Sequence, residues 1–193
     1  MEALFHLGFE LIKIGILASI YSWILLGIFR QINRSNPKSW FQKSTVNGKR
    51  FWVKSTRIIY LLLFIWMYTY WGNHGFGDSA RIPIGNGKVI KNINWSEYGY
   101  IENIRTSDND KIETTKFRIT NKKLIGNLDS WFYSYTNQYF LYDIRKNELV
   151  EFGRKLDFDK YAESNDLPTS SELLTFEQNY SKYWSGWRFW LLP

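Results

Sequence analysis

The chain has 193 residues, a formal net charge of +7 and no cysteine. The absence of cysteine excludes disulfide bonds, thiolate metal sites and cysteine nucleophiles. The basic excess lies within residues 30–57, which hold eight basic residues and no acidic one, whereas residues 73–193 carry 16 of each. A nucleic-acid-binding domain carries its bases on its own folded surface, so this distribution argues against nucleic acid as a partner.

Residues 1–29 are predicted to contain a first transmembrane helix. Residues 14–29 carry no charge, and with the preceding turn they give about 20 residues, enough to cross roughly 30 Å of hydrocarbon. The alternatives are a signal peptide and a buried helix of a soluble protein. A signal peptide has its bases before the apolar run, and here they follow it. Two apolar runs flanking a wholly basic segment argue against the buried helix.

Three small residues on the first helix recur at helical spacing and are predicted to form its packing face: Gly15, Ser19 and Ser22. Small side chains allow helices in a membrane to approach closely. The alternative is that glycine and serine are simply common in membrane helices.

Residues 58–72 are the second uncharged run and are predicted to be the second transmembrane helix of a helical hairpin. Trp71 then lies at the outer interface, where aromatic residues gather.

The segment between the two runs, residues 30–57, is predicted to be a basic cytoplasmic loop. Short loops rich in Lys and Arg stay on the cytoplasmic side of a membrane. Both termini are therefore expected outside the cytoplasm, with the chain in a bacterial inner membrane and residues 73–193 in the periplasm.

Within this loop a set of basic and aromatic residues is predicted to contact the inner leaflet or a partner: Lys43, Lys49, Arg50, Trp40 and Trp52. Each base near an anionic leaflet contributes on the order of 1 kcal/mol. Asn47-Gly48 is a strong hairpin signal and predicts a small aromatic hairpin here. The alternative is a solvated loop.

Residues 73–193 are predicted to form a small extracytoplasmic α+β domain, an antiparallel β-meander followed by two C-terminal helices. Segments with β-branched and aromatic residues alternate with Gly, Asn and Asp clusters, as in strands joined by turns. Strands are expected over residues 88–94, 98–105, 112–120, 131–135, 138–144 and 148–152. In the last pair, Phe140, Tyr142 and Ile144 alternate on one face, and Leu149 is expected to meet them across the turn.

The end of the chain is predicted to be helical. Residues 157–165 form one short helix, and a capping-box pattern from Thr169 to Glu172 opens a second. Trp187 and Trp190 follow. They are candidates for the outer membrane interface or a partner contact, or they complete the core of the domain. The size of the domain favours the core, because a small domain needs its large apolar groups.

No catalytic, cofactor-binding or metal-binding residue is predicted. Gly77-Asp78-Ser79 resembles the start of a serine-hydrolase motif, but no histidine follows Ser79 to act as its base. Residues 85–88 lack the spacing of a phosphate loop and are better explained as a hairpin turn between residues 82–84 and 89–90. His74 and Asp78 are too few ligands for a metal ion.

The expected function is that of a membrane-anchored, non-enzymatic binding module, an accessory subunit of a bacterial envelope complex. Its expected partners are the lipid bilayer and another membrane or periplasmic protein. One alternative is an immunity or resistance protein that neutralises an envelope-acting toxin. A second is an enzyme with an unrecognised site in the outer domain.

Overall fold

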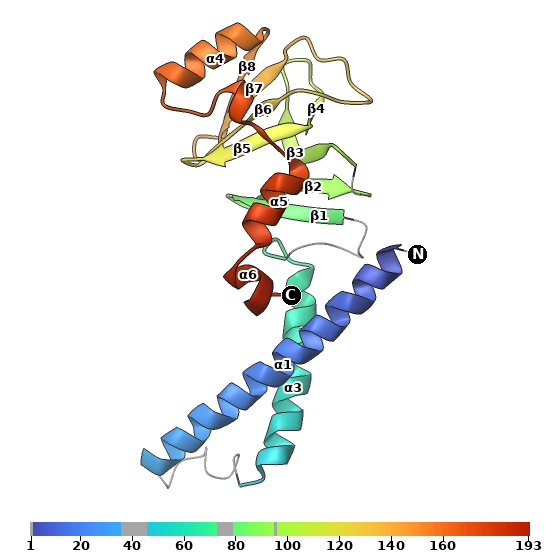
Figure 1. Ribbon diagram of the computed structural model, residues 1–193, viewed down its shortest axis with the longest axis vertical. Helices are drawn as coiled ribbons and strands as arrows, with labels where there is room; N and C mark the ends of the chain where they lie inside the picture. The colour runs from blue at the N-terminus through green and yellow to red at the C-terminus, as the bar shows by residue number, and fades with distance from the viewer. Residues whose placement is uncertain (1, 36–45, 73–78, 95) are drawn as a thin grey trace. The chain divides into compact units, whose positions relative to one another are not determined.

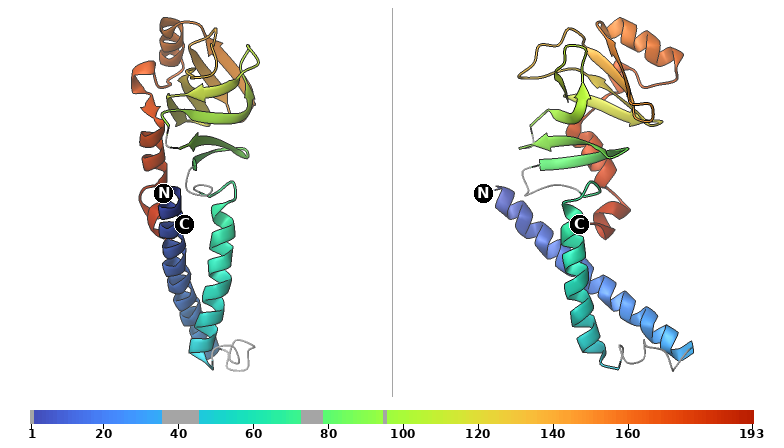
Figure 2. Two further views of the ribbon diagram at one scale, coloured as in Figure 1. Left: turned by 90° about the vertical axis from the view of Figure 1, so that its right-hand side faces the viewer. Right: turned by 180° about the vertical axis from the view of Figure 1, so that it is seen from behind.

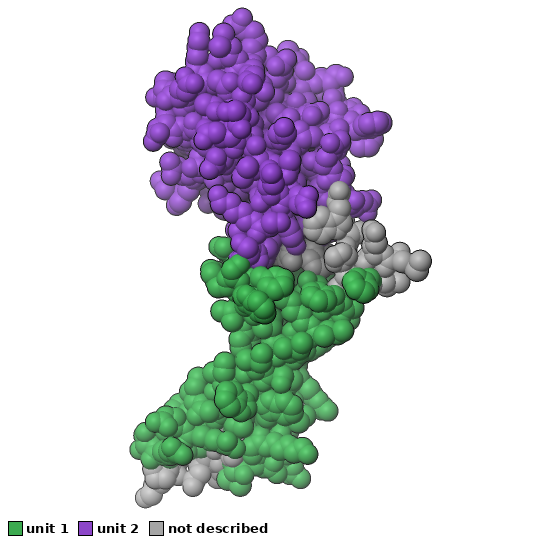
Figure 3. Space-filling view, viewed as in Figure 1, with its two compact units in different colours: residues 1–72, 186–193 green, residues 73–185 purple. Residues whose placement is uncertain are grey.

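The computed structural model of the chain describes residues 2–35, 46–72, 79–94 and 96–193 (Figure 1). The chain folds into two compact units, which Figure 3 colours separately. Residues 1–72 and 186–193 form a helical unit, and residues 73–185 form a β-rich unit. The structure combines helices with antiparallel sheets, so the predicted α+β content is confirmed.

Two long helices make up most of the helical unit, α1 (Glu2–Ser35) and α3 (Gly48–Met67), and they cross and pack against each other (Figure 2). The buried residues of α1 recur mainly every fourth position, which places them on one face. They are Glu10, Ile14, Leu17, Ala18, Ser22 and Leu26. Trp52 of α3 donates its Nε1–H to the Ser19 carbonyl at 3.2 Å and so links the two helices.

Among the described residues, one helix is long and apolar enough to span a membrane, over Leu7–Ser35. A membrane anchor and a signal sequence share this composition. The segment predicted as the second span, residues 58–72, contributes the last ten residues of α3 and then turns at residues 68–72. The first half of α3 carries its bases instead: Lys49, Arg50, Lys54 and Arg57.

The basic segment predicted as a loop, residues 30–57, contains helix at both ends. α1 continues to Ser35 and α3 begins at Gly48. The prediction of a hairpin at Asn47-Gly48 is wrong, because α3 begins there. The Asn47 side chain accepts a hydrogen bond from the Arg50 N–H at 3.1 Å and caps the N-terminus of α3. Asparagine suits helix caps and hairpin turns alike, so the residue pair alone does not distinguish them.

The C-terminal helix α6 (Trp187–Leu191) belongs to the helical unit. Tyr21 of α1 donates its hydroxyl hydrogen to the Leu191 carbonyl. The Lys13 Nζ atom lies 5.0 Å from the centroid of the Phe189 ring, a cation–π distance. The end of the chain is therefore held against α1.

This placement contradicts the prediction that Trp187 and Trp190 complete the core of the domain. The two side chains are 59% and 72% exposed. The core of the β-rich unit is formed instead by aliphatic residues together with four aromatic residues from its own strands and from α5, namely Phe117, Phe140, Tyr142 and Phe176. The domain therefore has enough large apolar groups without the tail.

Two antiparallel sheets form the β-rich unit. The first has the order β1-β2-β3-β4: β1 (Ser79–Gly85), β2 (Lys88–Ile93), β3 (Gly99–Arg105) and β4 (Lys111–Thr114). The second has the order β8-β7-β6-β5-β9: β5 (Lys116–Thr120), β6 (Lys123–Asn127), β7 (Tyr139–Asp143), β8 (Glu148–Phe152) and β9 (Leu174–Thr175). The strands are antiparallel as predicted, but they form two sheets, and β9 pairs with β5 and so departs from a simple meander.

Inward-facing residues of both sheets share one core. On β1, alternate residues Ala80, Ile82 and Ile84 are buried in it. From the second sheet it takes Phe140 and Tyr142, and Tyr142 lies opposite Leu149 as predicted. Side chains of a strand alternate between faces, so this pattern places one side of each sheet on the same core.

The chain changes sheets at Thr115, where one strand was predicted over residues 112–120. Asn127 holds this corner with its side-chain amide. Its Oδ1 accepts from the Lys116 N–H at 2.8 Å and from the Thr114 hydroxyl at 3.0 Å, and its Nδ2 donates to the Thr115 hydroxyl at 2.7 Å. A Cβ on the neighbouring Gly126 would lie 2.8 Å from the buried Phe140 ring, so the corner also needs glycine there.

Helices cover the second sheet and its edge. α4 (Lys155–Ser164) begins two residues earlier than predicted, and its Phe158 packs on the outer face of that sheet. The predicted capping box at Thr169 is present, but it opens only the short helix η1 (Ser170–Glu172). A second capping box, from Thr175 to Gln178, opens α5 (Phe176–Trp184). The sequence holds two capping-box patterns close together, so the start of α5 was ambiguous.

α5 joins the two sheets. Its Asn179 donates to the Phe117 carbonyl of β5 at 2.8 Å, and its Trp184 donates from Nε1 to the Arg81 carbonyl of β1 at 2.8 Å. Phe176 enters the shared core. One helical face therefore bonds to strands of both sheets.

We expect Asn127→Ala to destabilise the β-rich unit by about 2–3 kcal/mol, because it removes three hydrogen bonds at the corner. Urea unfolding of the full chain in detergent, followed by near-UV circular dichroism, measures the change. Asn127→Asp keeps the accepting oxygen, so we expect it to lose less stability than Asn127→Ala. Equal stability of Asn127→Ala and the parent chain would show that the corner does not depend on this amide.

Candidate functional site

Three hairpin turns meet at one end of the β-rich unit. They are the β1–β2 turn at Asn86-Gly87, the β5–β6 turn at Asn121-Lys122 and the β7–β8 turn at residues 144–147. The Ile144 N–H donates to the Lys122 carbonyl at 3.0 Å, and the Asn86 side chain donates to the Ile144 carbonyl at 2.5 Å. These bonds hold turns from both sheets together.

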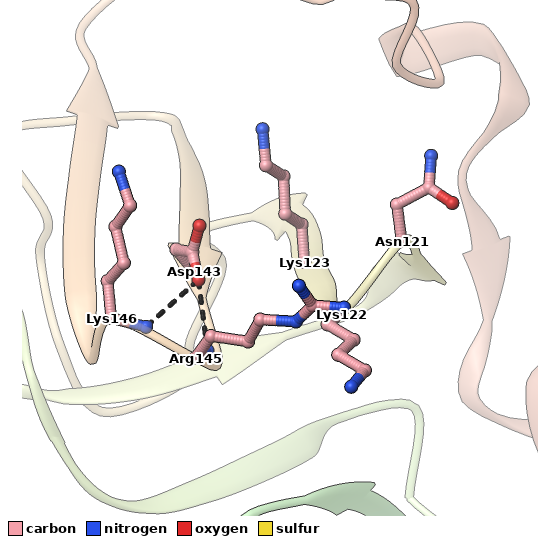
Figure 4. Close-up of a pocket in the computed structure, with 6 residues that line it drawn as sticks. All are labelled: Asn121, Lys122, Lys123, Asp143, Arg145 and Lys146. Atoms are coloured by element: carbon pink, nitrogen blue, oxygen red, sulfur yellow. Dashed lines mark hydrogen bonds between the residues drawn. The ribbon is translucent and has the colours of Figure 1, made fainter.

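A hollow of about 610 Å³ opens at two of these turns. We call it the basic hollow; it is lined by Asn121, Lys122, Lys123, Asp143, Arg145 and Lys146 (Figure 4). Four of these side chains are cations and one is a carboxylate. Residues 73–193 as a whole have balanced charges, so the hollow is a local concentration of positive charge.

The one carboxylate of the hollow is engaged with the backbone. The Asp143 Oδ1 atom accepts from the Lys146 N–H at 3.0 Å and from the Arg145 N–H at 2.9 Å (Figure 4). The bond from the Lys146 N–H, with that from Arg145 and the charges of Lys146 and Lys123, lowers the pKa of Asp143 below its ordinary value of 3.8. In the described part of the chain, none of the four cations forms an ion pair with a carboxylate.

Lys122 occupies a backbone conformation that favours glycine. Asn121 and Lys122 have φ of +46° and +61°, as in a type I′ turn, where asparagine followed by glycine is preferred. A non-glycine residue in this region costs on the order of 1 kcal/mol. The turn therefore has a lysine at the expense of some stability.

A second feature is the loop between β6 and β7, residues 128–138, which we call the aromatic loop. Its Trp131 and Phe132 side chains are 80% and 76% exposed. Residues 131–135 were predicted as a strand, and this prediction is wrong. Aromatic residues favour strands, but here side-chain hydrogen bonds hold the backbone in an irregular path.

Hydrogen bonds from β4 and the neighbouring loop fix the aromatic loop. The Ser130 hydroxyl donates to the buried Glu113 carboxylate and accepts from the Phe132 and Tyr133 N–H groups at 2.9 and 3.1 Å. The Tyr135 hydroxyl accepts from the Glu113 N–H at 3.0 Å and donates to the Lys111 carbonyl at 2.6 Å. Burial raises the pKa of Tyr135 above its ordinary value of 10.0.

The predicted packing face of α1 consists of Gly15, Ser19 and Ser22. Ser22 is fully buried, and the Ser19 carbonyl accepts the bond from Trp52. A Cβ on Gly15 would lie 3.9 Å from the Tyr60 ring of α3. Gly15 and Ser19 therefore lie against α3.

The residues predicted to contact lipid or a partner are separated in the chain. Trp40 and Lys43 lie outside the described residues. Lys49 and Arg50 are exposed in the first turn of α3, whereas Trp52 lies against α1. Trp71 is 61% exposed, and Trp187 and Trp190 are exposed in α6. Their contacts with lipid or a partner stay predictions.

Sequence reasoning missed the basic hollow and the aromatic loop. Residues 122–123 and 145–146 each show two adjacent bases at a turn, but only the pairing of β6 with β7 brings them together. In the part of the chain that the structure describes, no three metal-ligating side chains come together. The chain matches no known protein family, no curated protein and no solved structure.

We expect the stabilising effect of Asp143 to depend on pH. Its pKa is lowered in the folded chain, so the carboxylate stabilises the fold fully above about pH 4 and loses this effect as the pH falls through the folded value. Asp143→Asn should therefore lower the melting temperature of the full chain at pH 6. The difference should shrink toward pH 3. A difference that is constant with pH would contradict a role for the charge.

Proposed function

We propose that this protein is a membrane-anchored, non-enzymatic binding module that acts as an accessory subunit of a bacterial envelope complex. The observation that supports it best is the aromatic loop, in which fixed backbone presents Trp131 and Phe132 to solvent. Large aromatic side chains supply much of the binding energy in protein interfaces. A loop that is already ordered loses little conformational freedom when it binds.

Exposed apolar residues on the two long helices support the membrane anchor. Outside their mutual contact, the helices expose Phe9, Ile12, Ile16, Ile20, Trp23, Ile24 and Ile28 on α1 and Ile58, Leu61, Leu62 and Ile65 on α3. Soluble proteins rarely expose so large an apolar surface to water. Lipid tails covering both helices account for it.

The anchor that we propose is a helical hairpin with residues 58–72 as its second span. This run is short for a bilayer, and Lys54 and Arg57 extend it by reaching toward the headgroups. Trp71 then lies in the opposite interface. The bases of residues 30–57 face the cytoplasm, and the β-rich unit lies in the periplasm.

The absence of cysteine gives a direct test of this topology. A single cysteine at the exposed Ser134 should react with a membrane-impermeant maleimide in cells whose outer membrane is permeabilised. A cysteine at Lys49 should react only after the inner membrane is disrupted. The reverse labelling pattern would overturn the orientation, and labelling of both sites in intact spheroplasts would exclude a spanning second helix.

The binding role is tested by the double variant Trp131→Ala/Phe132→Ala. Both side chains are mostly exposed, so we expect the melting temperature to change little. In mild-detergent purification from the native source, the variant should lose a partner protein that the parent chain retains in stoichiometric amount.

Leu156→Ala provides the matched control, because Leu156 is an exposed apolar residue on α4, 59% accessible and outside the aromatic loop. It should retain the partner. Loss of the partner from both variants, or from neither, would contradict a role for the loop. A partner identified as a secreted toxin would favour the immunity alternative over the accessory subunit.

A further inference from the structure

We propose that the basic hollow binds a phosphate group, carried by a soluble phosphorylated molecule or by a lipid headgroup. This proposal is independent of the aromatic loop and of the membrane topology. It uses a different part of the β-rich unit, and no motif in the sequence assigns it.

The charge of the hollow supports an anionic ligand. The hollow is lined by Lys122, Lys123, Arg145 and Lys146, and within the described residues no carboxylate lies at salt-bridge distance from them. The one acid, Asp143, is already bonded to two backbone N–H groups. Four cations and one carboxylate leave the hollow with a net positive charge, and an anion bound there reduces the repulsion among the cations.

The number and kind of cations favour phosphate over a carboxylate. A phosphate monoester carries a charge of about −1.5 to −2 and three acceptor oxygens at pH 7. The Arg145 guanidinium offers a planar fork of donors that matches phosphate oxygens, and lysine ammonium groups add point charges around it. A single carboxylate would bring only one negative charge to the same four cations, which is less than a phosphate monoester brings.

The hollow is built before any ligand arrives. The bond from the Ile144 N–H to the Lys122 carbonyl joins the two hairpins that carry the cations, and Asn86 secures the Ile144 carbonyl from the first sheet. The backbone under the cations therefore needs no ordering on binding, which lowers the entropic cost.

Lys122 adds an independent observation. It holds a strained φ of +61° at a turn position where glycine is preferred. Strained residues gather at functional sites, where the strain is offset by the rest of the structure. In our proposal, Lys122 stays at this position for its charge, so stability and binding should respond in opposite directions when glycine replaces it.

The test uses the full chain in phosphatidylcholine nanodiscs, titrated with inorganic pyrophosphate by calorimetry. We expect saturable binding to the parent chain and its loss in Arg145→Ala/Lys146→Ala. Lys122→Gly should bind about tenfold more weakly, and it should melt about 2–4 °C higher because the turn is relieved.

Lys155→Ala/Lys160→Ala is the matched control, because it removes two exposed bases from α4 and changes the net charge by the same amount. It should bind pyrophosphate like the parent chain. The absence of saturable binding, equal weakening in the control, or parent-like binding by Lys122→Gly would each overturn the proposal.

A second arm distinguishes the two sources of phosphate. If the ligand is a lipid headgroup, nanodiscs containing phosphatidic acid, whose headgroup is a phosphate monoester, should weaken pyrophosphate binding to the parent chain by competition. If the ligand is soluble, binding should be the same in both kinds of nanodisc. Either result supports a phosphate site, because both require binding that Arg145→Ala/Lys146→Ala loses.

Discussion

The side-chain amide of Asn127 bonds to the three consecutive residues at which the chain leaves one sheet and enters the other. At this corner the chain passes from β4 of one sheet to β5 of the other, and inward-facing residues of both sheets share one core. The same residue ends β6 and so fixes where the aromatic loop begins. Glu113, two residues before the corner, holds that loop through Ser130. One amide thus positions the core and the base of an exposed loop.

Local patterns predicted the parts of the fold that local physics determines. The β7–β8 hairpin follows from alternating apolar residues around a polar turn, and the pairing of Tyr142 with Leu149 agrees with it. The position of α4 was predicted within two residues, since its apolar spacing is clear. The corner at Thr115 was not predicted, because residues 112–120 have strand-like composition throughout and the break depends on Asn127, distant in sequence.

The candidate sites were not predictable for a related reason. The basic hollow requires turns that are separated by more than 20 residues and become neighbours only through the pairing of β6 with β7. In the aromatic loop, the residues themselves suggest a strand, and hydrogen bonds to β4 override that preference. The tryptophans of the tail suit a core and an interface equally well in the sequence. Their exposure and the contacts of α6 with α1 exclude the core.

The return of α6 to α1 also means that the β-rich unit is attached to the helical unit at both of its ends. Cleavage by a protease before Ser79 would leave it joined through α6, and cleavage after Ser185 would leave it joined through the chain that follows α3. Shedding this unit as a soluble fragment therefore takes two cleavages, or one cleavage together with dissociation of α6. A double attachment of this kind protects a domain against release by a single cut.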